Sequence, residues 1–208
     1  MRKDVPTVFI VDDDLFVCKA LQRLIKSVDL NAKTFASAGE FLRFDRPDTP
    51  CCLLLDVRMP EMSGLVLQER LAGSDSTLPI IFMTGYGDVP MSVRAMKAGA
   101  VDFLQKPFDD QTLLVAIHLA VDQDRRARQE RAKIKEIQER LETLTPREHE
   151  VFVLVVKGMR NKQIAEKLGT SEKTIKVHRS RVMRKLQVKS LVELVQLAEK
   201  IKTDYPKG

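Results

Sequence analysis

Residues 8–121 alternate five times between a short apolar run and a segment whose apolar residues recur at helical spacing. Short apolar runs bounded by turn residues are typical of strands buried on both faces of a parallel sheet. The strands are predicted at 8–11, 33–35, 53–56, 78–83 and 101–104. The helices are predicted at 15–28, 38–44, 64–71, 89–98 and 110–121. Because each strand leads to the next through a helix, we predict a doubly wound α/β fold with a five-stranded parallel sheet in the order 2-1-3-4-5.

Polar residues stand at the carboxyl ends of four of these strands. Asp12 and Asp13 follow the first strand, Asp56 ends the third, Thr84 follows the fourth and Lys106 follows the fifth. Open α/β sheets bind their ligands at this edge. We therefore interpret Asp56, at the end of a central strand, as the acceptor of a phosphoryl group and the others as parts of the same site.

The residue types at this edge suit phosphate chemistry. Carboxylates packed together repel one another and need a cation to stay ionised. Oxygen ligands favour Mg²⁺, which commonly binds one or two carboxylates together with phosphate and water. Thr84 offers a hydroxyl donor and Lys106 a positive charge. Pro107 follows Lys106, and we predict a cis peptide bond there that directs the lysine towards Asp56.

Each of these residues also has an ordinary interpretation. An aspartate triplet at 12–14 is typical of a helix N-cap with solvated charge, Thr84 of a turn, and Lys106 of a surface. The combination is more specific because each polar residue closes a separate strand. A Mg²⁺-dependent phosphohydrolase is the main alternative, since Asp12-x-Asp14 resembles the nucleophile motif of that class. Phe16 stands where that motif requires Thr or Val, and no cap domain is apparent.

Residues 6–122 resemble the receiver domain of two-component response regulators. The stretch Thr-Gly-Tyr-Gly-Asp-Val-Pro-Met at 84–91, with Ala-Met-Lys-Ala-Gly-Ala at 95–100, is similar to the FixJ branch of that family. The resemblance implies a flavodoxin-like or CheY-like domain over residues 1–122. It also implies that the protein is not an enzyme beyond its own Mg²⁺-dependent phosphorylation and dephosphorylation.

The resemblance assigns roles to the residues at the sheet edge. It makes Asp56 the phosphoacceptor, Thr84 the switch hydroxyl and Lys106 the essential lysine. Phe103 falls at the switch aromatic, where many relatives carry Tyr. The Mg²⁺ ligands it implies are Asp13, Asp56 and the main-chain carbonyl of Arg58, with Asp12 acting through water.

The net charge of +6 conceals a division between the two halves. Residues 1–123 carry 13 Lys and Arg against 17 Asp and Glu, a net charge of −4. Residues 124–208 carry 22 against 12, a net charge of +10. This asymmetry indicates an acidic domain joined to one that meets a polyanion.

Composition indicates a globular protein of the cytoplasm. Hydrophobic residues make up 44% and charged residues 31%, and no apolar run approaches the roughly 20 residues of a membrane span. The sequence at 1–4 leads straight into the first strand without a signal-peptide region. Cys18, Cys51 and Cys52 form no spaced framework, so we expect small buried side chains in a reducing compartment.

Residues 123–143 are predicted to form a helical linker. No Gly or Pro occurs from 110 to 144, and the linker is rich in Arg, Lys, Glu and Gln, which favour helices. Ile134, Ile137, Leu141 and Leu144 form an apolar stripe at spacings of 3, 4 and 3 residues. The linker is either a solvated helix or one whose stripe pairs two protomers or packs on the following domain.

Residues 144–208 are predicted to form an all-α domain of four helices. Thr145, Pro146 and Glu148 form a capping box that begins the first helix. The four helices are expected at 146–157, 161–168, 172–186 and 190–201. Gly169, with Ser171 as the next cap, joins the second and third as a helix-turn-helix. The third helix is predicted to expose Lys173, Lys176, Arg179, Arg181, Arg184 and Lys185, which favours DNA binding.

Residues 144–202 resemble the LuxR-type output domain. The matching motifs are Leu-Thr-x-Arg-Glu-x-Glu-Val at 144–151, Asn-Lys-Gln-Ile-Ala at 161–165 and Thr-Ile-Lys-Val-His at 174–178. The resemblance implies that Lys176, Val177 and Ser180 face base edges. It implies phosphate contacts for Lys162, Lys173, Thr174, Arg179 and Arg181. His178 is interpreted as structural or phosphate-facing.

Together the two resemblances imply a response regulator of the FixJ/NarL type. A sensor histidine kinase would phosphorylate Asp56, and the protein would then dimerise through helix 4 and strand 5, about residues 88–104. The paired output domains would bind a two-fold promoter site and regulate transcription, with RNA polymerase as a further partner. A third possibility is a DNA-binding protein whose receiver only holds a constitutive dimer together.

Overall fold

The structure is a computed structural model that describes residues 5–73, 78–85 and 89–204, with side chains to residue 201. Residues 86–88, which belong to the FixJ-like motif, and residues 1–4 lie outside the described ranges. The chain divides into two compact units, and the division falls between Arg128 and Gln129. In the described ranges, no helix is both long enough and apolar enough to cross a bilayer.

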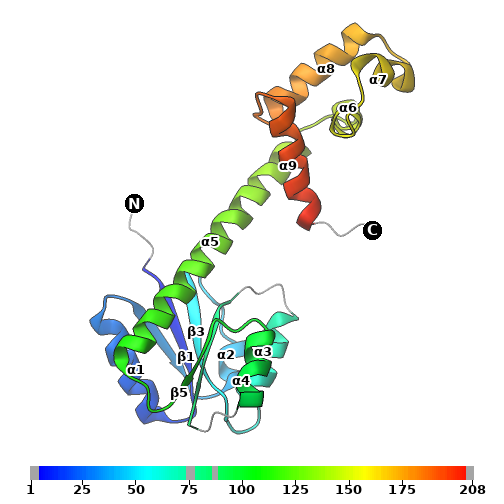
Figure 1. The fold of residues 1–208 in the computed structure, drawn as a ribbon. Helices are drawn as coiled ribbons and strands as arrows, with labels where there is room; N and C mark the ends of the chain where they lie inside the picture. The colour runs from blue at the N-terminus through cyan, green and yellow to red at the C-terminus, as the bar shows by residue number, and fades with distance from the viewer. Residues whose placement is uncertain (1–4, 74–77, 86–88, 205–208) are drawn as a thin grey trace. The chain divides into compact units, whose positions relative to one another are not determined.

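The first unit contains one parallel sheet (Figure 1). Its strands are β1 (Thr7–Val11), β2 (Asn31–Phe35), β3 (Cys51–Asp56), β4 (Ile80–Thr84) and β5 (Asp102–Gln105). They lie in the order β2-β1-β3-β4-β5, so the predicted topology is confirmed. β4 begins at Ile80 rather than at 78, because Pro79 has no N–H to donate to a neighbouring strand. Its carbonyl still accepts a hydrogen bond from Leu53 at 2.9 Å.

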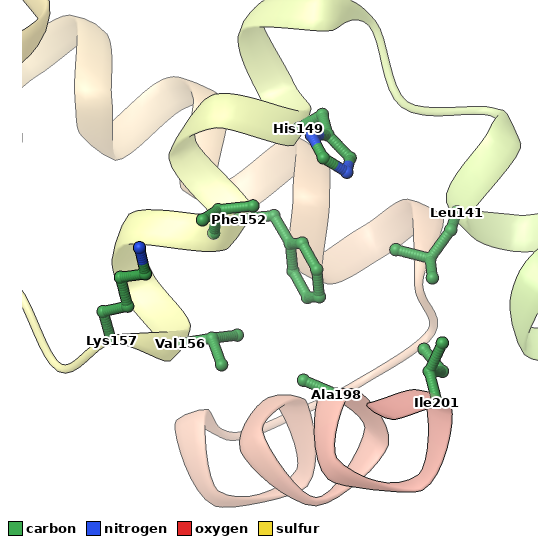
Figure 2. Close-up of a pocket in the computed structure, with 8 residues that line it drawn as sticks. Leu141, His149, Phe152, Val156, Lys157, Ala198 and Ile201 are labelled. Carbon is green, nitrogen blue, oxygen red and sulfur yellow. The ribbon is translucent and has the colours of Figure 1, made fainter. Parts of the chain in front are cut away.

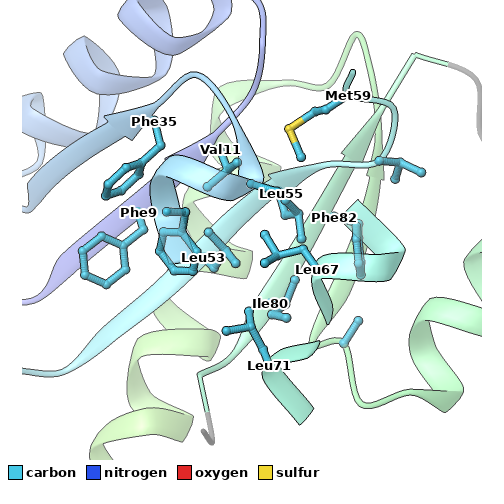
Figure 3. Packing of buried hydrophobic residues seen from close by; sticks show 14 of the residues in the cluster. Phe9, Val11, Phe35, Leu53, Leu55, Met59, Leu67, Leu71, Ile80 and Phe82 are labelled. Carbon is cyan, nitrogen blue, oxygen red and sulfur yellow. The ribbon is translucent and has the colours of Figure 1, made fainter. Parts of the chain in front are cut away.

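Helices cover both faces of the sheet. The helices of this unit are α1 (Leu15–Ser27), α2 (Ala38–Leu42), α3 (Gly64–Ala72), α4 (Val89–Lys97) and the first part of α5 (Asp110–Glu142), which continues into the second unit. Alternate strand residues point to opposite faces. Leu53 and Leu55 therefore pack with α2, α3 and α4, whereas Leu54 packs with α1 and α5. Figure 3 shows part of the first cluster, with Leu67 of α3 beside Leu55. The three cysteines are buried and free, as predicted.

The second unit is helical. It contains α6 (Pro146–Val156), α7 (Asn161–Leu168), α8 (Glu172–Lys185) and α9 (Leu191–Asp204) around one apolar core. The predicted capping box is present, since Thr145 accepts from the Glu148 N–H and Glu148 accepts from the Thr145 N–H. Gly169 ends α7 in the left-handed region at φ 62°, and the Ser171 hydroxyl accepts from the Thr174 N–H. The predicted helix-turn-helix is confirmed.

The end of α5 packs on this second core. Ile137, Leu141 and Leu144 are partly buried against the cluster formed by α6 to α9. Leu141 also lines a cavity of about 230 Å³, shown in Figure 2, whose remaining walls come from α6 and α9. Of the two interpretations of the apolar stripe, the structure favours a helix whose stripe packs on the output domain over a fully solvated one.

Candidate functional site

The sheet register brings the predicted polar residues to one edge. Val11 lies opposite Leu55, and Asp56 lies opposite Met83, so β1, β3 and β4 end at the same level. Asp12 follows β1 directly, and Thr84 is the last residue of β4. The carboxyl ends of neighbouring parallel strands thus converge, as the fold requires.

Lys106 joins the two buried carboxylates at this edge. Its Nζ donates to Asp12 Oδ2 at 2.6 Å and to Asp56 Oδ1 at 2.7 Å. The remaining oxygen of Asp56 accepts from the Arg58 N–H at 2.7 Å. The Lys106–Pro107 peptide bond is cis, as predicted. The structure therefore brings together Asp12, Asp56 and Lys106 as one hydrogen-bonded cluster.

Burial and charge act against each other in this cluster. Asp12 is only 2% exposed, and burial raises its pKa despite the hydrogen bonds from Lys106 and the Asp14 N–H. Burial alone would lower the pKa of Lys106, but its hydrogen bonds to Asp12 and Asp56 outweigh that effect and raise it. A cation is thus needed beside these carboxylates, and in this state the lysine supplies it.

The other two members of the aspartate triplet have different surroundings. Asp14 is the N-cap of α1, and its carboxylate accepts from the Phe16 and Val17 N–H groups. Asp13 is exposed. The helix-cap interpretation is therefore confirmed for Asp14, whereas Asp12 lies in the hydrogen-bonded cluster with Lys106 and Asp56.

The donor set at this edge fits Mg²⁺ by its chemistry. The side chains of Asp12, Asp13 and Asp56 supply only carboxylate oxygens, which are the hard ligands that this ion prefers. Within the described ranges no three acidic, histidine or cysteine side chains already converge as a metal cluster. Two of the carboxylates are instead directed at Lys106.

Gly64 packs directly against the main chain of Asp56, and this contact was not predicted from the sequence. A Cβ at this position would lie 2.3 Å from the main-chain oxygen of Asp56, closer than real contacts allow. The Gly64 N–H also donates to the Val57 carbonyl at 3.0 Å. Only glycine lets the start of α3 approach the end of β3 so closely. A lone glycine before an apolar helix gives no sequence signal for this contact.

The two predicted switch residues lie on adjacent strands. Thr84 is buried at the end of β4, and its carbonyl accepts from the Lys106 N–H at 2.7 Å. Phe103 is half-buried on β5, where its ring lies 6.1 Å from that of Phe82. The Phe103 ring has no hydroxyl, so it meets its neighbours by packing alone.

α8 is the second helix of the helix-turn-helix, the position of the recognition helix in this motif, and it exposes most of the predicted DNA-binding residues. These are Lys173, Thr174, Lys176, Val177, Ser180 and Arg181 on α8, with Lys162 in the first turn of α7. Arg179 is half-buried, and one guanidinium nitrogen donates to Asn161 Oδ1 at 3.1 Å, which ties α8 to the start of α7. His178 Nδ1 is buried and has no hydrogen-bond partner among the residues described.

The surroundings of Lys185 differ from the prediction. It was expected to be an exposed basic residue, but its side chain is 28% exposed and donates to Glu148 at 2.6 Å and to the Thr143 carbonyl at 2.7 Å. Glu148 is 2% exposed, and the hydrogen bond from Lys185 lowers its pKa to about 2. The capping-box glutamate therefore also anchors the end of the recognition helix.

Comparisons with known proteins agree with this organisation. Residues 8–118 match the model of the response regulator receiver domain, and residues 142–198 match that of the bacterial regulatory proteins of the luxR family. Transcriptional regulatory protein FixJ of Bradyrhizobium diazoefficiens is 40% identical over 191 residues, which cover 92% of this chain and 93% of FixJ. The chain belongs to the FixJ/NarL-type response regulators.

Two further relatives of this response regulator match along almost its whole length. Nodulation protein W of Bradyrhizobium diazoefficiens is 47% identical over 192 residues, covering 92% of this chain and 85% of the relative. The solved structure of the response regulator StyR matches with a TM-score of 0.82 at 47% identity, and the match covers 94% of this chain and 99% of StyR. The response regulator is thus a phosphorylated transcriptional regulator with a DNA-binding output domain, and not an enzyme in the usual sense.

Proposed function

We propose that a sensor histidine kinase phosphorylates this response regulator on Asp56. The observation that carries the proposal is the hydrogen bond from Lys106 to Asp56, at the edge where a parallel sheet binds its ligands. In the transfer, the N–P bond of a phosphohistidine breaks as an Asp56 carboxylate oxygen forms a bond to phosphorus. The Lys106 ammonium then pairs with an oxygen of the phosphoryl group.

Mg²⁺ is the proposed cofactor. Asp13, Asp56 and the main-chain carbonyl of Arg58 would hold it directly, and Asp12 through water. When bound, the ion neutralises negative charge on the transferring group. The side chains of Asp12 and Lys106 contribute by holding the Asp56 carboxylate in a fixed orientation before transfer.

The proposed consequence is dimerisation and DNA binding in the cytoplasm. The Thr84 hydroxyl and the Phe103 ring shift towards the new charge, and this favours a pre-existing active state. α4 and β5 then form the dimer surface. The exposed apolar side chains Val93 and Met96 on α4 fit this role.

The paired output domains would read a two-fold promoter site. Lys176, Val177 and Ser180 are proposed to face base edges, since they lie exposed on α8. Lys162, Lys173, Thr174 and Arg181 are proposed to contact phosphates, and so is the free part of the Arg179 guanidinium. RNA polymerase is the proposed further partner at the promoter.

The test is phosphorylation of Asp56→Asn by a small acyl phosphate with Mg²⁺. The wild-type protein should take up one phosphoryl group, measured by intact mass, and the variant none. DNA affinity should rise with the phosphodonor in the wild type alone. Full labelling of Asp56→Asn would move the acceptor to Asp12 or Asp13. Equal DNA affinity with and without phosphorylation would instead favour a receiver that only holds a constitutive dimer.

A further inference from the structure

A second charged cluster lies at the opposite end of β3 from the phosphoacceptor. Asp124 of α5 is only 1% exposed, and its Oδ2 accepts from the Cys51 N–H at 2.9 Å. The same oxygen accepts from Arg128 Nε at 2.6 Å. Arg128 also donates to the Asp48 carboxylate and approaches Cys51 Sγ at 3.7 Å. These contacts join α5, the first residue of β3 and the loop before it.

Stability alone is a weak reason for such a cluster. Removing a carboxylate from water is costly, and a buried ion pair often stabilises a protein less than apolar side chains of similar size. Apolar residues surround the site, because Ala120 and Val121 on α5 are buried in the core one turn earlier. The cluster instead fixes the position of α5. Its hydrogen bonds are directional, so they hold the helix against sliding along its axis and rotating about it more strictly than apolar contacts do.

The cluster joins the strand that ends in Asp56 to the helix that continues into the second unit. β3 runs from Cys51 to Asp56, and all six of its residues are buried. A strand packed on both faces has little room to deform, so a displacement at Asp56 would be passed along it to the Cys51 N–H. Asp124 is the last buried residue of α5, and the helix continues to Glu142. The start of β3 is therefore bonded to the point where α5 leaves the receiver core.

We propose that Asp124 and Arg128 are positioning residues that carry the state of the phosphoacceptor strand to the helix leading to the output unit. This inference rests on the proposed phosphorylation of Asp56. In the proposed arrangement, Asp124 binds the main chain of β3, and Arg128 keeps the Asp124 side chain in its rotamer. A displacement of β3 is then transmitted through Asp124 to α5 and along that helix. Neither residue touches the phosphoryl group.

The chain contains a matched control for this pair. Asp122 and Arg125 form an ion pair at 2.5 Å on the same helix, with side chains 55% and 46% exposed. Both are charged residues in the same helical segment, but their ion pair joins them to each other and not to β3. Asp122→Asn and Arg125→Gln therefore change charge and helix composition without loosening the strand.

The experiment measures how strongly phosphorylation changes DNA affinity in the full chain. The probe is a duplex selected from a random library by the phosphorylated wild-type protein. The ratio of affinities with and without acyl phosphate and Mg²⁺ is measured for the wild type, Asp124→Asn, Arg128→Gln and the two controls. Phosphoryl uptake is measured by intact mass, and exchange of the Cys51 amide hydrogen shows whether the contact is loosened.

We expect Arg128→Gln and Asp124→Asn to accept the phosphoryl group as the wild type does. Their affinity ratio should fall about five-fold or more, while the controls keep the wild-type ratio. Arg128 is 25% exposed at the end of the receiver unit, so its variant keeps the test open even if Asp124→Asn folds poorly. A retained ratio with faster Cys51 exchange would overturn the positioning role alone. A wild-type ratio of one would overturn the proposed function, and this inference with it.

Discussion

Three neighbouring aspartates show how much a residue's role depends on its surroundings. Asp12 is buried beside Lys106, Asp14 caps α1, and Asp13 between them is exposed. The residue type alone does not distinguish these three carboxylates. Their surroundings differ because the chain passes from the buried strand β1 to the helix α1 within these three residues.

Gly64 is the second residue on which the site depends. We predict that Gly64→Ala lowers the free energy of unfolding by about 1–3 kcal/mol, because its Cβ would overlap the Asp56 main chain and force β3 or α3 to shift. The shift should also slow phosphoryl uptake by Asp56. Urea denaturation and intact mass measure the two effects. Gly73→Ala, where the nearest atoms lie 3.7 Å or more from the added Cβ, is the control and should show neither.

At the scale of elements, the recognition helix is fixed at both ends. The Ser171 hydroxyl caps its start, and Lys185 near its end binds Glu148 and the Thr143 carbonyl. Thr143 directly follows α5, so the end of the recognition helix is hydrogen-bonded to the residue at which α5 has just ended. The basic residues between these anchors are exposed except Arg179, which is half-buried and donates to Asn161.

The Glu148 anchor predicts a pH dependence. Its pKa is lowered to about 2 from an ordinary 4.5, chiefly by the hydrogen bond from Lys185, so the folded state favours the ionised carboxylate. That contribution to stability is present in full above about pH 4.5 and is lost as the pH falls towards 2. Glu148→Gln should lower the stability of α6 at pH 7 and flatten its decline between pH 5 and about 3.

Hydrogen exchange of the α6 amides, measured across that pH range, tests the effect within the second unit. Glu150→Gln is the matched control, because Glu150 is an exposed carboxylate two residues away that pairs with Arg147. If the stability of α6 declines equally steeply with falling pH in Glu148→Gln and in the wild type, another carboxylate is responsible for the decline.

The recognition helix also predicts two distinct effects on DNA affinity. Lys176→Ala should cost about 1–3 kcal/mol at the preferred site and relax preference at one base pair. Lys173→Ala, in the first turn, should weaken binding to all sequences about equally and reduce the salt slope by about one. Affinities for preferred and scrambled duplexes over a salt series separate the two. Parallel losses on both duplexes for Lys176→Ala would make it a phosphate contact.

At the scale of the whole molecule, the sequence predicted elements better than it predicted their contacts. Strands and helices follow from local periodicity, and Asp56, Thr84 and Lys106 were predicted as site residues because each closes a strand. The contacts of Asp124 and Lys185 were not predicted, because each lies in a run of charged residues that is typical of a solvated helix. Their burial depends on distant partners, Cys51 and Glu148, and no local pattern encodes those distances.

The bridge made by Lys106 has a thermodynamic consequence for the first unit. The lysine acts as a resident counter-ion, so the resting fold does not depend on a dissolved ion to hold Asp12 and Asp56 together. Replacing Lys106 by Met should make the stability of the first unit depend on a dissolved cation. We expect Lys106→Met to be less stable than the wild type in chelator and to regain stability as Mg²⁺ is added, with a far smaller response in the wild type. Melting temperatures over a Mg²⁺ series measure this, and an equal response in both proteins would contradict it.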